Sequence, residues 1–296
     1  MTQAPQAFFL PAAPPSTGQR FCIYHPALGD SVRGRVVYVH PFAEEMNKSR
    51  RMAALQSRAL AAAGFSVLQI DLHGCGDSSG DFGDASWDDW VNDVVQAVDW
   101  LTERDEAHAK APLWLWGLRA GCLVAGEAAA KLKEPSHFCF WQPATSGKLI
   151  LQQFLRLKLA ADMLSGNSKG LMDEMKRALA QGQSLEIAGY SLAAALATGL
   201  EKANLVPAPS GAEKPVPCRL EWLELSSRED AEITPVVHQS LDKWLAAGYV
   251  TQHQFVQGPS FWQTQEIEDA PTLLKATSAA FSNENPRPIN ALVGAP

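Results

Sequence analysis

A permanent positive charge stands where the backbone pattern of this sequence suits a reactive group. Residues 113–121 read as a short apolar strand, a tight bend and the start of a helix, with the pattern Gly-x-Arg-x-Gly and Arg119 at its apex. Glycines beside such an apex tolerate strain and let strand and helix approach closely. Arginine stays protonated and offers no lone pair, so Arg119 cannot be a nucleophile. Its guanidinium and the first N–H groups of the helix together favour an anionic ligand.

Alternating strand and helix patterns must position this bend. A hairpin is predicted from residues 8–10 and 20–24, and further strands are predicted at 35–40, 65–71, 112–116, 137–141, 218–225 and 250–256. Helices are predicted at 47–63, from Ser86 onward, up to Lys133, at 234–247 and at 265–281. Such alternation predicts an α/β protein with a mostly parallel central sheet flanked by helices.

Residues 144–212 interrupt the alternation. They contain helical patterns at 149–164, 171–180 and 192–202 and end in a run rich in proline, alanine and serine. We interpret them as a helical cap inserted into a core made of residues 1–143 and 213–282, with a tail at 283–296. The cap is expected over the carboxyl ends of the strands, where open α/β sheets bind ligands.

The order of elements and three motifs resemble the α/β-hydrolase fold. In that fold the bend is Gly-x-Ser-x-Gly, with a nucleophilic serine at the apex. The loop 71–78 resembles the superfamily's Asp-x-x-Gly-x-Gly-x-Ser loop, and His40 begins the segment that matches its oxyanion-hole loop. The resemblance implies that the backbone N–H groups of Phe42 and Ala120 cradle an oxyanion. In this bend the two glycines of the motif are present, and Arg119 takes the place of the serine.

The acid and base positions also depart from the hydrolase pattern. The acid is expected after the strand that ends at Leu225, where Glu229 and Asp230 lie one residue off the usual spacing. The base histidine is expected after the last strand, where the chain reads Gly-Pro-Ser at 258–260, and His253 lies within that strand. We therefore predict that ordinary serine-esterase chemistry does not occur at this bend.

Other nucleophiles and metal ligands are poorly placed. Ser191 lies in the cap region, where we interpret it as a helix N-cap or an exposed residue, and Cys122 is expected to point into helix packing. Cys75 lies near the bend, but only His40 or His73 could serve as its base. His40, Asp71 and His73 match no zinc-binding spacing, so neither a metal nor another cofactor is predicted.

Several segments resemble one narrower group across nearly the whole chain. They are PFAEEMNKSRRM at 41–52, WGLR at 116–119, QFLR at 153–156, AGY at 188–190 and GPSFW at 258–262. These segments are similar to those of the exosortase A system-associated hydrolases of type 2. The resemblance implies a bacterial protein encoded with exopolysaccharide and exosortase genes, and hence partners in that pathway. It implies no substrate, because the group is named for its fold.

Arg119 has two possible roles. It could bind a carboxylate or phosphate in a pocket with aromatic walls, or it could pair internally with Glu44, Glu45, Asp71 or Glu229, because an unpaired buried charge is costly. The remaining residues predicted for the oxyanion hole and the ligand are His40, Phe42, Ala120, Glu44, Asp71, Trp141, Ser260, Phe261 and Trp262.

Three functions are compatible with these residues. The first is a degenerate hydrolase that binds an anionic or acyl small molecule. The second is an active hydrolase or acyl transferase for esters or thioesters, with a non-standard nucleophile or a water activated by Glu44, Asp71 or Asp230 and Arg119 as stabiliser. The third is a partner of membrane-bound assembly enzymes that binds through its cap.

Composition narrows the choice of partners. The 296 residues carry a formal net charge of −7, which argues against nucleic acid as a partner. No run of about 18 apolar residues predicts a membrane span, and the N-terminus lacks the pattern of a signal peptide. The five cysteines are scattered and form no CxxC pair, which predicts reduced thiols and a cytoplasmic protein.

Overall fold

The computed structural model describes residues 4–29, 31–104, 108–163, 170–207, 218–228 and 230–283. Its central feature is an eight-stranded sheet in the order β1-β2-β4-β3-β5-β6-β9-β10. β2 pairs antiparallel with β1 and β4, and the other neighbours are parallel, which confirms the predicted mostly parallel sheet. The strands are β1 (Gln6–Pro11), β2 (Gln19–His25), β3 (Gly34–Val39), β4 (Phe65–Ile70), β5 (Leu113–Leu118), β6 (Ser136–Trp141), β9 (Arg219–Ser226) and β10 (Val250–Gln257).

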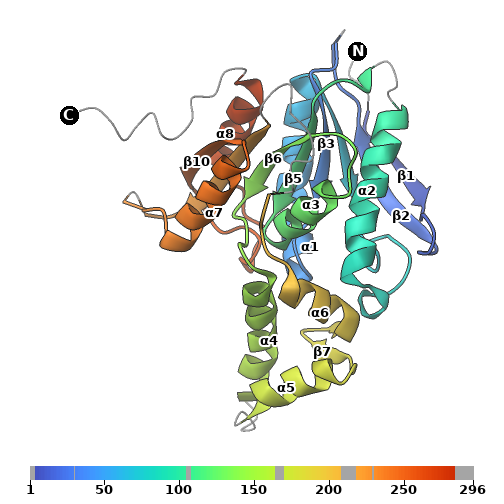
Figure 1. The fold of residues 1–296 in the computed structure, drawn as a ribbon, viewed down its shortest axis with the longest axis vertical. Helices are drawn as coiled ribbons and strands as arrows, with labels where there is room; N and C mark the ends of the chain where they lie inside the picture. The colour runs from blue at the N-terminus through green and yellow to red at the C-terminus, as the bar shows by residue number, and fades with distance from the viewer. Residues whose placement is uncertain are drawn as a thin grey trace.

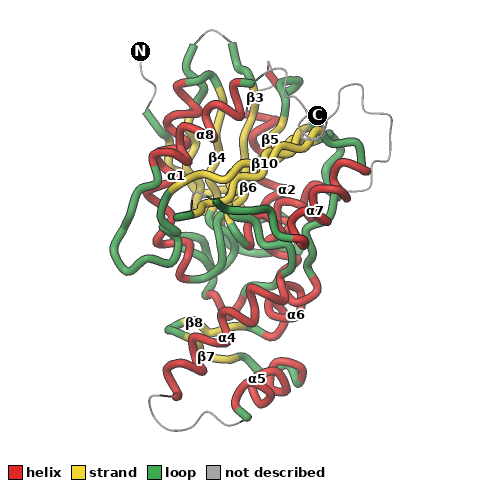
Figure 2. Tube along the Cα trace, turned by 90° about the vertical axis from the view of Figure 1, so that its left-hand side faces the viewer, coloured by secondary structure: helices red, strands yellow, loops and turns green. Residues whose placement is uncertain are grey.

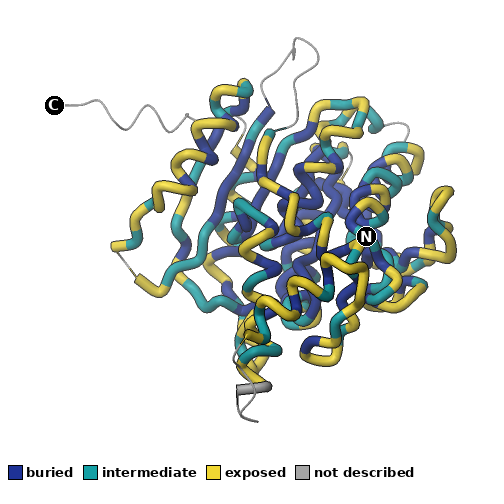
Figure 3. The backbone as a smooth tube through the Cα atoms, turned by 60° about the horizontal axis from the view of Figure 1, so that its bottom comes forward, coloured by how far each residue is buried: buried dark blue, intermediate teal, exposed yellow. Residues whose placement is uncertain are grey.

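Helices cover both faces of this sheet (Figure 1). They are α1 (Glu44–Ala62), α2 (Trp87–Arg104), α3 (Ala120–Ala129), α7 (Pro235–Ala246) and α8 (Pro271–Ser282). Successive side chains of a strand point to opposite faces. In β3, Val37 and Val39 therefore join the core under α2, α3 and α7, whereas Val36 and Tyr38 join the core under α1 and α8. Figure 3 shows the buried strands between helices whose outer surfaces are exposed.

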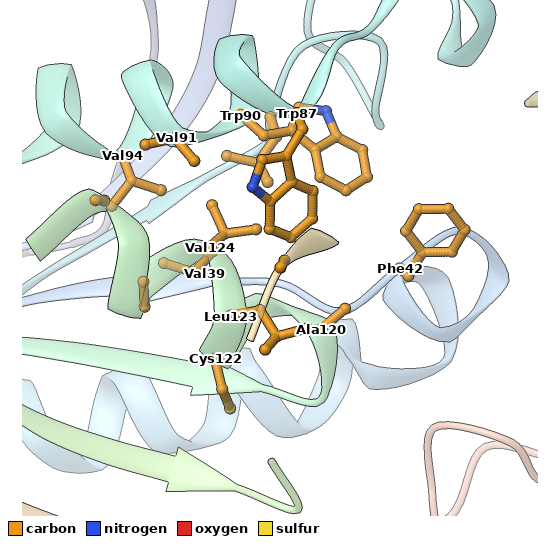
Figure 4. Close-up of a cluster of buried hydrophobic side chains, with 14 of the residues drawn as sticks. Val39, Phe42, Trp87, Trp90, Val91, Val94, Ala120, Cys122, Leu123 and Val124 are labelled. Atoms are coloured by element: carbon orange, nitrogen blue, oxygen red, sulfur yellow. The ribbon is translucent and has the colours of Figure 1, made fainter. Parts of the chain in front are cut away.

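The packing of α2 on α3 holds the bend in place. Ser86 and Asp89 cap α2 reciprocally, because the backbone N–H of each residue donates to the side chain of the other at 3.1 Å, as in a capping box. Figure 4 shows the buried face of α2 lying against α3, and the labelled residues there are Trp87, Trp90, Val91, Val94, Leu123 and Val124. Because α3 begins directly after Arg119, this core fixes the direction in which the bend points.

The segment after β6 leaves the sheet and gathers at one end of the molecule (Figures 1 and 2). It contains α4 (Gly147–Met163), α5 (Leu171–Ala180), the hairpin β7 (Leu185–Ile187) and β8 (Tyr190–Leu192), and α6 (Ala194–Lys202). The sequence did not predict this hairpin, whose short strands carry no long apolar run. The predicted end of the cap, residue 212, lies outside the described residues, as does the tail from residue 284 onward.

Several helix bounds differ from those predicted. α1 begins at Glu44 rather than at Asn47, which brings Glu44 and Glu45 into its first turn, where carboxylates suit the helix dipole. α8 begins at Pro271 rather than at residue 265, because proline fits the first turn of a helix. α3 ends at Ala129 and does not reach Lys133.

Candidate ligand site

Arg119 stands at a strained bend between β5 and α3. Its φ of 55° and ψ of −117° lie in a region that residues with a side chain rarely adopt. A Cβ atom on Gly117 would lie 2.7 Å from the backbone nitrogen of Cys122, and one on Gly121 would lie 2.3 Å from the carbonyl oxygen of Val39. Both glycines are therefore required for the close approach of strand and helix.

The guanidinium of Arg119 connects three parts of the chain. Nε donates to Oε1 of Glu45 on α1 at 3.2 Å, and Nη2 donates to Oε1 of Gln153 on α4 at 2.7 Å. Cζ lies 5.7 Å from the ring centroid of Trp262, in the loop after β10. Among the described residues, Nη1 has no hydrogen-bond partner. Internal pairing with Glu45 is thus present, but it leaves one amino group of the guanidinium unused.

The guanidinium lines a pocket of about 510 Å³ beneath α4. Six residues named from the sequence line this pocket: Phe42, Glu44, Glu45, Arg119, Ser260 and Trp262. They come from the loop after β3, the first turn of α1, the bend and the loop after β10. The carboxyl ends of these strands therefore bring together residues that are far apart in the sequence.

Sequence reasoning missed much of the pocket wall. Polar groups come from Lys48, Gln142, Gln153 and Gln263, and an apolar stripe comes from Ile150, Phe154 and Leu157 on α4. The stripe residues follow the spacing i, i+4 and i+7, which places them on one helix face. That spacing is visible in the sequence and could have indicated the stripe. Gln142 could also have been found, because it follows β6 directly, as Arg119 follows β5.

Glu45 has the most perturbed carboxyl group in the pocket. Burial raises its pKa to about 7, with Glu44 adding to the rise and with Arg119 and Lys48 opposing it. One oxygen of each glutamate, Oε2, is buried and accepts no hydrogen bond from the described residues. The pocket therefore contains a cation beside a carboxyl group that changes its protonation near neutral pH.

Other predicted residues lie behind the pocket wall rather than on it. Trp141 is buried in the core under α8, where its Nε1–H donates to Oγ1 of Thr277 at 2.8 Å. Phe261 is fully buried and packs edge-on against Trp141. Ala120 is buried too, and its N–H and that of Phe42 donate no hydrogen bond to a described residue. No described residue therefore accepts a hydrogen bond from either N–H group proposed for the oxyanion hole.

His40 is hydrogen-bonded to two loops. Its Nε2 accepts a hydrogen bond from the N–H of Leu72 at 3.2 Å, so Nδ1 carries the proton and donates to the carbonyl of Pro41 at 2.8 Å. Burial lowers the pKa of His40, which keeps the ring neutral. With both ring nitrogens engaged, His40 positions two loops and has no free nitrogen for a substrate.

Asp71 is paired away from Arg119. Its Oδ2 accepts hydrogen bonds from Nη2 of Arg50 at 2.8 Å and from the N–H of Asp77 at 3.1 Å. Its backbone carbonyl accepts a hydrogen bond from the hydroxyl of Ser78 at 2.5 Å. The loop that resembles the superfamily motif is therefore closed around Asp71, which does not line the pocket.

Asp230, the described candidate for a catalytic acid, does not line the pocket. Asp230 is exposed on the surface, where Arg228 forms an ion pair with it at 3.1 Å and lowers its pKa. Glu229 lies outside the described residues. His253, in β10, is paired with Glu224 at 2.6 Å, and the described lining of the pocket contains no histidine.

The alternative nucleophiles are also unsuitable. Cys122 is fully buried, and burial raises the pKa of its thiol far above the ordinary value. Burial raises the pKa of Cys75 in the same way, so neither forms a thiolate near neutral pH. Ser191 is exposed on β8, where it does not cap a helix.

A second, larger hollow of about 830 Å³ lies between α2 and α3 on one side and α5 and α6 on the other. Small residues such as Gly126, Ala130 and Gly199 line much of it, together with Trp87. Among its charged lining residues, Glu127 is already engaged, because its Oε2 accepts a hydrogen bond from Nε1 of Trp87 at 2.8 Å. We therefore place the candidate site at Arg119. Within the described chain, no cluster of His, Cys, Asp or Glu could hold a metal ion, and no helix has the length and apolarity that a membrane span needs.

One family model and one curated relative match parts of this chain. A family model described as serine aminopeptidase, S33, matches residues 30–180, just over half of the chain. The human protein ABHD12B is 32% identical over 117 residues, which cover 40% of this chain. The matched part spans only 30% of that relative's length.

Solved structures show the same fold. Est1E from Butyrivibrio proteoclasticus, with ferulic acid bound, is 14% identical, with 89% of this chain and 93% of that chain covered and a TM-score of 0.59. A soluble variant of monoglyceride lipase from Saccharomyces cerevisiae, in complex with a substrate analogue, is 14% identical, with 95% and 96% covered and a TM-score of 0.58. XC6422 from Xanthomonas campestris, a serine hydrolase without a lid, is 15% identical, with 94% and 92% covered and a TM-score of 0.53. These likenesses confirm the α/β-hydrolase fold predicted from the sequence.

Proposed function

The chain belongs to the serine aminopeptidase S33 family, and we propose that it uses this fold to bind an anionic small molecule at Arg119 rather than to hydrolyse a substrate through a serine. The observation that carries the proposal is the guanidinium at the strained bend. A non-glycine residue in such a conformation costs of order 1–3 kcal/mol and persists where the surroundings enforce it. Here the strain places a cation in the pocket at the position where the fold usually presents a nucleophile.

The surroundings of Arg119 support an anion site. Nη1 is unused by the described residues, the N–H groups of Phe42 and Ala120 are unoccupied, and the start of α3 adds the positive end of a helix dipole. Lys48 supplies a second cation on the pocket wall. Arginine binds carboxylates and phosphates with two parallel hydrogen bonds, so either group would suit this position.

Binding and turnover test the proposal together. We expect phosphate or a short carboxylate to raise the melting temperature of the wild-type protein and to leave that of Arg119→Ala unchanged. We also expect short-chain p-nitrophenyl esters to be hydrolysed no faster by the wild type than by Arg119→Ala or Arg119→Ser. Equal stabilisation of wild type and Arg119→Ala by every anion would contradict the proposal.

A second function is favoured by one specific observation. Glu45, whose pKa lies at about 7, stands beside Arg119, as a general base beside an electrostatic stabiliser would. In this alternative, Glu45 takes the proton of a water that attacks an ester or thioester. Ester turnover that disappears in both Glu45→Gln and Arg119→Ala would favour this hydrolase over the binding protein.

The biological setting rests on the sequence resemblance. Residues 41–52 and 258–262, which resemble the exosortase-associated hydrolases, also contribute to the pocket. This supports a cytoplasmic role with partners in exopolysaccharide assembly. A strain without the gene should make less exopolysaccharide, and wild type but not Arg119→Ala should restore it. Full restoration by Arg119→Ala would separate the pathway role from the pocket.

A further inference from the structure

Resting on the proposed function, we propose that the ligand is a monocarboxylate with an apolar chain, and that its carboxylate replaces Glu45 at Arg119 while Glu45 takes up one proton from solvent. The proposal has two parts, the chemical class of the ligand and the coupling of binding to a proton. Both follow from the arrangement of charges and apolar side chains around Arg119.

Two of the three nitrogens of the guanidinium already have partners. Nε and Nη2 form the side-on edge of an arginine, and here they donate to Glu45 and Gln153 respectively. A carboxylate binds this edge with two parallel hydrogen bonds. It can do so only if Glu45 gives up Nε and Gln153 turns aside. The unused Nη1 offers a first contact for the incoming anion before Glu45 moves.

Charge balance explains why a proton should follow. The described pocket wall carries two carboxylates, Glu44 and Glu45, and two cations, Lys48 and Arg119. A bound carboxylate would add a third negative charge in a mostly buried site, where like charges disfavour each other's ionisation. Protonation of Glu45 restores the balance. Its Oε2 already lacks a hydrogen-bond partner among the described residues, so no contact of that oxygen is lost.

The groups around Glu45 make it the carboxyl group that titrates. Glu44 and Lys48 face it from α1, and Arg119 faces it from the bend; Gln153 of α4 and the loop residues Ser260 and Gln263 are neutral. Tyr190 of β8 lies beside Glu44, and its phenol is neutral at these pH values. Because the pKa of Glu45 is about 7 with Arg119 beside it, loss of that cation to a ligand must raise the pKa further.

The shape of the pocket selects a ligand with an apolar chain. Ile150, Phe154 and Leu157 of α4 lie on one helix face over the pocket. Phe154 is already buried against Phe42, whereas the side chain of Leu157 is 40% exposed and can still be covered by a ligand. The volume of about 510 Å³ lies in the range of small-molecule sites, roughly 300–1,000 Å³. A bare phosphate would leave the side chain of Leu157 exposed, whereas an alkyl or aryl chain would cover it.

Titration calorimetry with octanoate, below its micelle concentration, tests both parts. Cationic buffers with different heats of ionisation avoid a competing anion and report the protons exchanged. At pH 8 we expect about one proton taken up per octanoate bound, and a Kd that rises roughly tenfold per pH unit above the pKa of Glu45. Acetate should bind far more weakly than octanoate. In Glu45→Gln the Kd should be independent of pH, whereas Glu44→Gln should still take up the proton.

The outcomes separate this inference from the proposed function. Octanoate binding that needs Arg119 but exchanges no proton would overturn the coupling and leave the anion site standing. Phosphate binding that needs Arg119, without octanoate binding, would overturn the ligand class. If no anion depends on Arg119, both proposals fail. Proton uptake that survives in Glu45→Gln and disappears in Glu44→Gln would show that Glu44 takes up the proton. That result would overturn the proposed coupling to Glu45.

Discussion

Two arginine–carboxylate pairs of this protein look alike and are built differently. Arg20 and Asp93 are both fully buried, and Nε of Arg20 donates to Oδ1 of Asp93 at 2.7 Å. The rest of that guanidinium donates to the carbonyl of Thr17 and the hydroxyl of Ser16, and Oδ2 of Asp93 accepts from the N–H of His73. Every nitrogen and oxygen of the pair has a partner.

The pair of Arg119 and Glu45 is incomplete by comparison. Among the described residues, Nη1 of Arg119 and Oε2 of Glu45 have no hydrogen-bond partner, and both side chains are partly exposed to the pocket. Burial raises the pKa of both carboxyl groups, Asp93 to about 6 and Glu45 to about 7. A perturbed pKa therefore does not distinguish the two pairs. The unused donor and acceptor do, because a complete pair has nothing left for a ligand.

The largest expected effect comes from removing one charge from each pair. Asp93→Asn leaves Arg20 buried without a counter-charge, which typically costs about 3–5 kcal/mol. Glu45→Gln should leave the free energy of unfolding at pH 7.5 unchanged or slightly higher, because Arg119 retains Gln153 and contact with solvent. Urea denaturation of both variants measures this difference. An equal loss in both would mean that the pocket pair is as structural as the buried one.

A smaller effect is expected at the bend that presents Arg119. In Gly121→Ala the new Cβ would lie 2.3 Å and 2.6 Å from the carbonyl oxygens of Val39 and His40, so the strand must move. Such overpacking costs about 1–3 kcal/mol. Gly126 in the same helix is the matched control, since a Cβ there would make ordinary contacts with Leu205 at 3.4 Å and with the carbonyl oxygen of Val206 at 3.9 Å. Gly126→Ala should stabilise α3 by up to about 1 kcal/mol through helix propensity.

Thermal denaturation of the two glycine variants measures both changes. If Gly121→Ala is as stable as Gly126→Ala, the bend is less tightly packed than the structure indicates. Anion binding is a second readout, because only Gly121→Ala should displace the guanidinium. Loss of binding in Gly126→Ala would contradict the assignment of the site to this bend.

A smaller, pH-dependent effect separates Glu45 from its neighbour Glu44. Its pKa is raised on folding, so the folded state holds a proton that the unfolded chain has lost, and stability falls as pH rises between about 5 and 7. In the wild type we expect this contribution to amount to roughly 2 kcal/mol. Glu45→Gln should remove it and Glu44→Gln should keep it, when unfolding is followed from pH 5 to pH 8. Identical pH profiles for wild type and Glu45→Gln would contradict the raised pKa.

The sequence predicted the strand-to-helix bend that carries Arg119 better than it predicted the residues that line the pocket. Gly117 and Gly121 demand a tight strand-to-helix bend whatever surrounds them, and this local requirement placed Arg119 correctly between β5 and α3. Which face of the sheet a side chain joins depends on register and on helix packing. Trp141 was expected on the pocket wall, but it points toward α8.

The partners of Arg119 were harder to predict for the same reason. Glu45 was one of four possible counter-charges, and the choice depends on α1 beginning at Glu44, earlier than its sequence pattern indicated. Gln153 reaches the guanidinium only because α4 folds back over the strand ends. Contacts that need two separate elements to dock do not appear as a spacing in the chain.

The smallest effect is expected at a third arginine–carboxylate pair, and it tests the remaining candidate for a catalytic acid. Arg228 and Asp230 lie on the surface with most of both side chains exposed, so solvent and salt screen their attraction. Asp230→Asn should therefore change neither the midpoint of unfolding nor the binding of octanoate. Its matched partner is Glu45→Gln, which should alter the pH dependence of binding and have little effect on stability at pH 7.5. A different result is possible, namely that Asp230→Asn abolishes an ester turnover seen in the wild type. The surface loop would then have to close over Arg119 during catalysis. In that case the incomplete pair of Arg119 and Glu45 would be the resting state of an enzyme.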